Sequence, residues 1–152
     1  MRAMKTLFLY YSNSGNGEAV AEKAKELGAD LCRVERHKKL PKGFFGIFAG
    51  GFSATRKKKD KLKDFSPNIE GYERIIIGSP IWNARLSCPI NTVLDVLDLK
   101  DKKVDFLLYS GSGEAPKAVE RIKKEYPEAK YVIMKSPKKY GENLKKVEEL
   151  FE

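Results

Sequence analysis

The sequence predicts one α/β domain, in which helices cover both faces of a parallel sheet. Strand-sized apolar runs alternate with segments of helical period along the chain. Gly- and Ser-rich loops follow three of these runs, as is common where parallel strands end in ligand-binding loops. The chain has 152 residues, the size of a single domain. This alternation is typical of β-α-β crossovers.

Five strands account for the apolar runs. The first includes Leu7 to Tyr11, the third Tyr72 to Ile77 and the fourth Val104 to Tyr109. We expect strands near residues 5–11, 30–35, 72–78, 103–109 and 130–135. With right-handed crossovers, five such strands fit the sheet order 2-1-3-4-5.

Helices are expected between these strands. A stretch of helical period follows Gly17, and an apolar helix follows Pro89, a residue suited to the first helical turn. We expect helices near residues 16–28, 88–97, 115–126 and 140–151.

The segment from Arg36 to Asn68 lies where the second crossover helix should be. It contains a Phe- and Gly-rich stretch, residues 43–52, and then a basic run, residues 56–63. The Phe side chains must be buried, in a short helix on the sheet, near the ligand edge or against a second subunit. We favour a helix and loop for this segment.

The first Gly- and Ser-rich loop has the features of a phosphate-binding loop. It joins a strand to a helix, so unpaired backbone N–H groups and the positive end of the helix dipole converge there. Hydroxyl groups add donors, and glycines let the backbone approach a phosphate closely. An ordinary turn with a helix N-cap is the competing interpretation. The loop consists of Ser12, Asn13, Ser14, Gly15, Asn16 and Gly17.

Two further loops strengthen the phosphate interpretation, because the loops of parallel strands share one edge of a sheet. The second loop contains the only Trp of the chain. Although a lone Trp is more often a core residue, we expect Trp82 to lie in a loop rather than inside the sheet. The candidate binding residues are Ser79, Pro80, Ile81, Trp82 and Asn83 in the second loop and Ser110, Gly111, Ser112 and Gly113 in the third.

These loops resemble those of the short-chain flavodoxins and flavodoxin-like proteins that bind FMN. The family's phosphate loop reads roughly Thr/Ser-x-Thr/Ser-Gly-x-Thr, which Ser12, Ser14 and Gly15 match. Gly17 stands where the family usually has Thr, so one hydroxyl donor is missing and the backbone donor remains. The likeness covers about the whole chain and implies a flavodoxin-like three-layer sandwich.

The resemblance implies FMN as the cofactor and a place for each part of it. Residues 12–17 would hold the phosphate, and Trp82 would stack on the isoalloxazine. Backbone groups around Ser79, Asn83, Gly111 and Gly113 would meet the polar edge of the ring. The chemistry then belongs to the cofactor, because the sequence shows no carboxylate pair, Ser/His/Asp order or Cys/His arrangement suited to catalysis alone.

The charge of the chain departs from that of acidic flavodoxins. Lys and Arg number 30 against 21 Asp and Glu, which gives a formal net charge of +9. This basic balance, with Arg85 close after Trp82, predicts a less negative reduction potential than acidic relatives show, within the limits that salt screening sets. It also predicts redox partner proteins that are acidic at the contact. A homodimer is a further expectation.

Other features of the sequence narrow the class of protein. No apolar run is long enough for a membrane span or a signal peptide, so we expect a cytoplasmic protein. Cys32 and Cys88 form no disulfide framework, although Cys88, at a helix start, could be a redox thiol beside a flavin. The single histidine, His37, gives no support for a metal site.

We favour an FMN-binding protein that carries electrons between redox partners. The first alternative is an FMN-dependent NAD(P)H oxidoreductase of the quinone or flavin reductase type, because the same loops would serve both functions. The second is a binding module whose basic run contacts nucleic acid phosphates. A charged run is more often a solvated face, so nucleic acid is the least expected partner.

Overall fold

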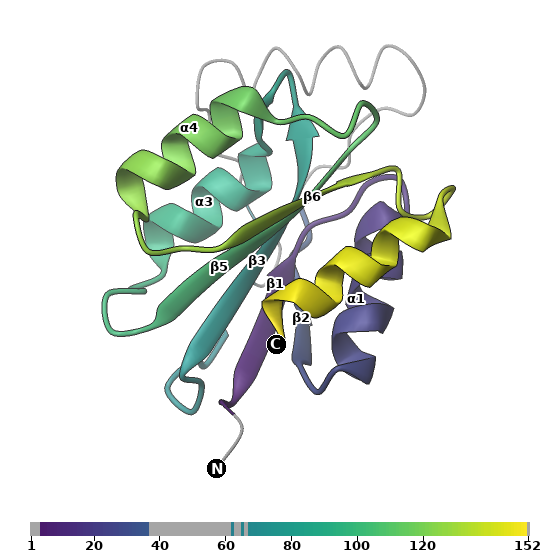
Figure 1. Ribbon diagram of the computed structural model, residues 1–152. Coiled ribbons are helices and arrows are strands. Elements are labelled where there is room, and N and C mark those ends of the chain that lie inside the picture. Colours follow the sequence, from purple (N-terminus) through teal and green to yellow (C-terminus); the bar gives the residue numbers. More distant parts are fainter. Residues whose placement is uncertain (1–3, 37–61, 63–64, 66, 152) are drawn as a thin grey trace.

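The computed structural model describes residues 4–36, 62, 65 and 67–151, and it shows a central sheet with helices on both faces (Figure 1). Among these residues, five strands run parallel: β1 (Thr6–Tyr10), β2 (Asp30–Arg33), β3 (Arg74–Trp82), β5 (Lys103–Ser110) and β6 (Tyr131–Lys135). Their order in the sheet is β2-β1-β3-β5-β6. Counted over the parallel strands alone, this is the predicted order 2-1-3-4-5, which is confirmed.

The helices form the two outer layers (Figure 1). One layer holds α1 (Asn16–Glu26) and η1 (Gly141–Leu150), and the other holds α3 (Cys88–Val96) and α4 (Pro116–Glu125). Successive strand residues face opposite layers. Phe8 therefore packs with Val20 of α1, whereas Leu9 belongs to the core that contains Ile90 of α3 and Ile122 of α4.

The main correction to the predicted fold lies at the end of β3. This strand continues to Trp82 and turns back into a two-residue strand, β4 (Arg85–Leu86), which pairs antiparallel with it. The turn residues Asn83 and Ala84 both have positive φ, 49° and 65°. Such a two-residue turn follows the right-handed twist of a hairpin. The expectation of a loop at Trp82 was wrong.

The ends of the other elements need smaller corrections. Helices α1, α3 and α4 lie within the predicted ranges, whereas residues 141–150 form a 3₁₀ helix instead of an α-helix. The Phe- and Gly-rich segment 43–52, His37 and all of the basic run 56–63 except Leu62 lie outside the described residues. The expected helix and loop in that segment therefore stays a prediction.

A buried ion pair lies at the amino-terminal ends of β3 and β5, which we call the amino edge of the sheet. The Arg74 guanidinium donates through Nε to the Asp105 carboxylate at 2.8 Å, and Asp105 is fully buried. The other carboxylate oxygen accepts the Lys130 amide N–H at 2.8 Å. Nearby, Lys102 Nζ donates to the carbonyl oxygen of Tyr72 at 2.7 Å. The polar groups at this edge thus bind one another.

Candidate functional site

The carboxyl edge of the sheet brings the predicted loops together. Tyr10 at the end of β1 pairs with Gly78 of β3, and Pro80 of β3 pairs with Tyr109 of β5. The loops that follow β1 and β5 therefore lie on either side of the β3–β4 hairpin. A turn after β6, which sequence reasoning did not single out, joins them at this edge (Figure 1).

The β1–α1 loop is folded around one oxygen atom. Ser12 Oγ accepts hydrogen bonds from the backbone N–H groups of Gly15, at 3.2 Å, and Gly17, at 3.0 Å. Gly15 is the N-cap of α1 and has a φ of 92°, in the left-handed region that favours glycine. Amides that already converge on a hydroxyl oxygen are suited to an anion oxygen. The loop therefore fits a phosphate group.

Ser12 and Tyr109 together explain why glycine stands at position 17. A Cβ on Gly17 would lie 2.9 Å from the Tyr109 hydroxyl oxygen and would also collide with Ser12 Cβ. The Tyr109 hydroxyl donates to the carbonyl oxygen of Tyr11, beneath the loop. Burial, with a smaller contribution from the Glu18 charge, raises the pKa of Tyr109 well above its usual 10.0. The phenol thus stays neutral and fills the space that the family's Thr side chain would need.

Two basic side chains flank the β1–α1 loop. Arg33 of β2 forms an ion pair with Glu18 and donates to the Ser12 carbonyl oxygen at 3.4 Å. Lys138, after β6, lies over Gly15. Sequence reasoning missed both residues, because neither belongs to a loop motif and both lie outside the β1–α1 segment in the sequence, Arg33 in β2 and Lys138 in the turn after β6.

Ser79, which the sequence placed in a loop, lies within β3 and has a structural role. Ser79 is fully buried, and its hydroxyl donates to the Pro80 carbonyl oxygen at 2.8 Å. Ser79 Oγ in turn accepts the Ser87 amide N–H at 3.1 Å. These bonds hold the end of β3 against the start of α3, so the hydrogen bonds of the Ser79 side chain are made within the protein.

Trp82 lies directly before the hairpin turn, pairs with Arg85 and is 8% exposed. Its ring meets Tyr11 edge to face, with centroids 5.8 Å apart. The Arg36 guanidinium lies over the ring, 5.7 Å from its centroid. The indole is thus held between Tyr11 and Arg36, and its stacking on isoalloxazine stays a prediction.

The β5–α4 loop is tightened by its own side chains. The Gly113 amide donates to Ser110 Oγ at 2.9 Å, and the Glu114 amide donates to Ser112 Oγ at 3.2 Å. Gly113 has a φ of 79°. Gly111 is exposed, and no atom lies within 4 Å of the place where its Cβ would be. Its backbone is therefore open to a ligand.

The structure sorts the predicted site residues by exposure. Those at the surface of the edge are Asn13, Ser14, Asn83, Gly111 and Ser112. Those half-buried behind them are Gly15, Asn16, Ile81 and Gly113. Those buried are Ser12, Gly17, Ser79, Pro80, Trp82 and Ser110. The exposed and half-buried groups surround the loops' backbone amides, and ligand contact by each residue stays a prediction.

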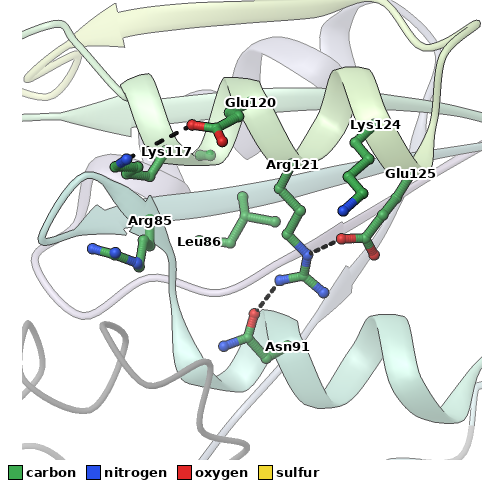
Figure 2. Close-up of a pocket in the computed structure, with 9 residues that line it drawn as sticks. Arg85, Leu86, Asn91, Lys117, Glu120, Arg121, Lys124 and Glu125 are labelled. Carbon is green, nitrogen blue, oxygen red and sulfur yellow. Dashed lines mark hydrogen bonds and ion pairs between the residues drawn. The ribbon is translucent and has the colours of Figure 1, made fainter.

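A cavity of about 250 Å³ lies beside the hairpin, between α3 and α4. Figure 2 shows Arg85 and Lys117 at one end of it and Arg121 deeper between the helices. Arg121 donates to Asn91 Oδ1 at 2.6 Å and to Glu125 at 2.9 Å. The lining has four basic residues, Arg85, Lys117, Arg121 and Lys124, and two acidic ones, Glu120 and Glu125.

The described residues also bear on cysteine, metal and membrane chemistry. Cys88 begins α3 and is fully buried, and burial raises the pKa of the Cys32 thiol. Within the described ranges, no group of three or more His, Cys, Asp or Glu side chains could hold a metal ion. No helix among them combines the length and apolar character needed to cross a membrane.

The five-stranded parallel sheet, its three layers and the amide-lined loop after β1 define a flavodoxin-like protein. A comparison with family models is consistent with this class: the chain belongs to the family described as NADPH-dependent FMN reductase, whose model matches residues 4–139. The flavodoxin-like FMN-binding family predicted from the loops is therefore confirmed. The match also supports FMN as the cofactor.

Solved structures share the fold. A protein from Bacteroides eggerthii is 25% identical, with a TM-score of 0.71 over 85% of this chain and 87% of the other. A flavoprotein from Lactobacillus acidophilus, solved in complex with FMN, is 23% identical, with a TM-score of 0.70 over 85% and 90%. A flavodoxin from the domain Archaea is 15% identical, with a TM-score of 0.55 over 97% and 94%. The comparison with curated proteins found no match.

Proposed function

We propose that this protein binds FMN at the carboxyl edge of its sheet and carries electrons between redox partners. The observation that carries this proposal is the β1–α1 loop, whose Gly15 and Gly17 amides converge on one oxygen at the start of α1. The family match supports it, as does the FMN complex of the Lactobacillus acidophilus neighbour.

Each part of the edge has a task in this proposal. The amides of residues 12–17 hold the phosphate, and the exposed backbone of Gly111 meets the polar edge of the ring. Trp82 supports the ring from the hairpin. When bound, FMN supplies one- and two-electron transfer, and the protein supplies its position and electrostatic surroundings.

A second candidate is reduction of the bound flavin by NADPH, followed by transfer to a small acceptor. The description of the matching family favours it. The phosphate loop serves both functions equally well, so the two candidates differ only in the source of the electrons.

Anaerobic spectroscopy of the FMN-loaded protein separates the candidates. An electron carrier keeps its flavin absorbance near 450 nm for minutes after NADPH is added, and loses it on reduction by dithionite. An NADPH-dependent enzyme loses this absorbance within seconds of mixing, which would replace the carrier proposal with the second candidate. A protein that takes up no FMN contradicts both.

The redox partner in this proposal is acidic at its contact. The basic residues around the cavity next to the hairpin supply a complementary surface (Figure 2). Arg85 ties this surface to the proposed ring site, because it pairs with Trp82 across the hairpin. Glu120 and Glu125 each bind a neighbouring cation, Lys117 at 3.8 Å and Arg121 at 2.9 Å. Among the described residues, Lys124 forms no ion pair, so it and Arg85 present positive charge to an approaching acidic protein.

Charge reversal tests this contact. Reduced protein is mixed with ferricyanide, an anionic acceptor, and the oxidation rate is followed at low and high salt. Arg85→Glu lowers the rate several-fold at low salt, because it removes electrostatic attraction next to Trp82, its partner across the hairpin, and the loss disappears at high salt. Lys25→Glu, on α1 in the opposite layer, is the matched control. Equal effects of the two variants contradict a localised contact.

A further inference from the structure

The turn after β6 is fixed to two of the ligand loops. The Ser136 amide donates to the Ser110 carbonyl oxygen at 2.9 Å, at the end of β5. The Lys138 amide donates to Asn16 Oδ1 at 3.1 Å, at the start of α1. Ser136 has a φ of 37°, and Pro137 between the two anchors is buried. The backbone of this turn is therefore held in place beside the β1–α1 loop.

These anchors direct the Lys138 side chain over the loop. A Cβ on Gly15 would lie 2.9 Å from Lys138 Nζ and 2.9 Å from its Cδ. The ammonium group thus covers the residue whose amide points at Ser12 Oγ. A side chain at position 15 would displace this flexible ammonium group, whereas the requirement for glycine itself comes from the positive φ.

Lys138 differs from the other cations near this edge. Arg33 is paired with Glu18. Lys135 and Lys139 lie over the Tyr140 ring, with Nζ 5.7 and 5.3 Å from its centroid. Among the described residues, no carboxylate lies within 4.0 Å of Lys138 Nζ. Its positive charge is therefore available to a ligand at the β1–α1 loop.

We propose that Lys138 binds the phosphate of FMN and makes the site selective for the phosphorylated flavin. The inference rests on the proposed function, since it assumes that the β1–α1 loop holds this phosphate. An ammonium–phosphate contact compensates for the hydroxyl donor that Gly17 lacks. Because Lys138 is exposed in the ligand-free chain, the contact weakens with salt.

Flavin titrations test this role. Apoprotein is titrated with FMN and with riboflavin, which lacks the phosphate, and binding is followed by quenching of flavin fluorescence. For Lys138→Gln we expect the FMN dissociation constant to rise about three- to tenfold at low salt, as loss of one charged contact would produce. The constant for riboflavin stays unchanged, and the FMN effect shrinks in high salt.

Two matched variants complete the experiment. Lys139→Gln removes the same charge from the neighbouring residue and leaves FMN affinity within twofold of the original. Lys138→Arg retains the charge and most of the affinity. The inference is overturned if Lys138→Gln binds FMN as tightly as the original protein, or if it weakens riboflavin equally. Failure of the original protein to bind FMN would instead overturn the proposed function itself.

Discussion

The two edges of the sheet differ in whether their polar groups are paired within the protein. At the amino edge, the Asp105 carboxylate binds the Arg74 guanidinium and accepts the Lys130 amide N–H, so these charged and backbone groups find partners within the protein. At the carboxyl edge, backbone amides gather in glycine loops, and Gly111 has open space beside its Cα. One edge is closed by its own contacts, and the other presents donors to a ligand.

Backbone strain follows the same division. Six described residues have positive φ, and five of them lie at the carboxyl edge: Gly15, Asn83, Ala84, Gly113 and Ser136. The sixth, Gly28, follows α1. Strained backbone persists where the surrounding structure enforces it, which is common at ligand sites. Glycine adopts positive φ without strain, so the conformational cost lies at Asn83, Ala84 and Ser136, and all three are at the carboxyl edge.

The largest effect is expected from breaking the ion pair at the closed edge. Asp105→Ala leaves the Arg74 guanidinium buried without its carboxylate, so the free energy of unfolding falls by about 3–5 kcal/mol. Urea unfolding measures this loss. FMN affinity of the folded fraction stays unchanged, because the pair lies at the edge opposite the loops. A loss below about 1 kcal/mol would contradict this account of the amino edge.

A smaller effect is expected from filling the β1–α1 loop. Gly17→Ala forces Ser12 and Tyr109 apart, which lowers the free energy of unfolding by about 1–3 kcal/mol and weakens FMN binding. Gly141→Ala, at the start of η1, is the matched control, because its new Cβ also meets no atom within 4 Å and the residue has no place in the proposed FMN site. Urea unfolding and flavin titration of both variants make the test. Equal stability of the two variants would contradict the proposed crowding.

Tyr109, at the carboxyl end of β5, gives a pH test. Tyr109→Phe removes the hydrogen bond to the Tyr11 carbonyl, at a cost of about 1 kcal/mol near neutral pH. The folded protein holds the Tyr109 pKa above its unfolded value of 10.0, so the neutral phenol stabilises the fold below pH 10.0. As pH rises above that value, the unfolded chain loses this proton first, and stability falls.

The stability difference between the original protein and Tyr109→Phe therefore narrows above about pH 10, because phenylalanine has no proton to lose. Urea unfolding at about pH 8 and pH 11 measures both values. Tyr10 and Tyr126 also have raised pKa values, through burial first, but they are present in both proteins and cancel. A difference that stays constant with pH would contradict the burial of a neutral Tyr109.

Much of the fold could be predicted because its signals are local. The runs at Leu7–Tyr11 and Ile75–Ile77 are long and apolar, and glycine-rich loops mark their ends. The extension of β3 to Trp82 was missed because Asn83 and Ala84 do not resemble the glycine-containing turns of most hairpins. Ala84 adopts its conformation through a tertiary contact, since its carbonyl oxygen accepts the Ala118 amide at 2.9 Å.

The site was predictable only where it is built from consecutive residues. The amides of the β1–α1 loop belong to one hexapeptide and were found. Tyr109, Arg33 and Lys138 reach the same loop from β5, β2 and the turn after β6, through contacts that no sequence spacing reveals. The one sequence signal of this environment was Gly17 itself, whose missing side chain matches the space that Tyr109 occupies.

The smallest predicted effect removes strain from the open edge. Ala84 has a φ of 65°, a conformation that costs an L-residue about 1 kcal/mol and costs glycine little. Ala84→Gly therefore raises the free energy of unfolding by about 0.5 kcal/mol, after the added freedom of the unfolded chain is subtracted. In the matched control, Ala19→Gly within α1, the same substitution lowers stability by about 0.5–1 kcal/mol. If the two substitutions change the free energy of unfolding in opposite directions, the hairpin holds backbone strain that a regular helix lacks. A change in the same direction would contradict backbone strain at Ala84.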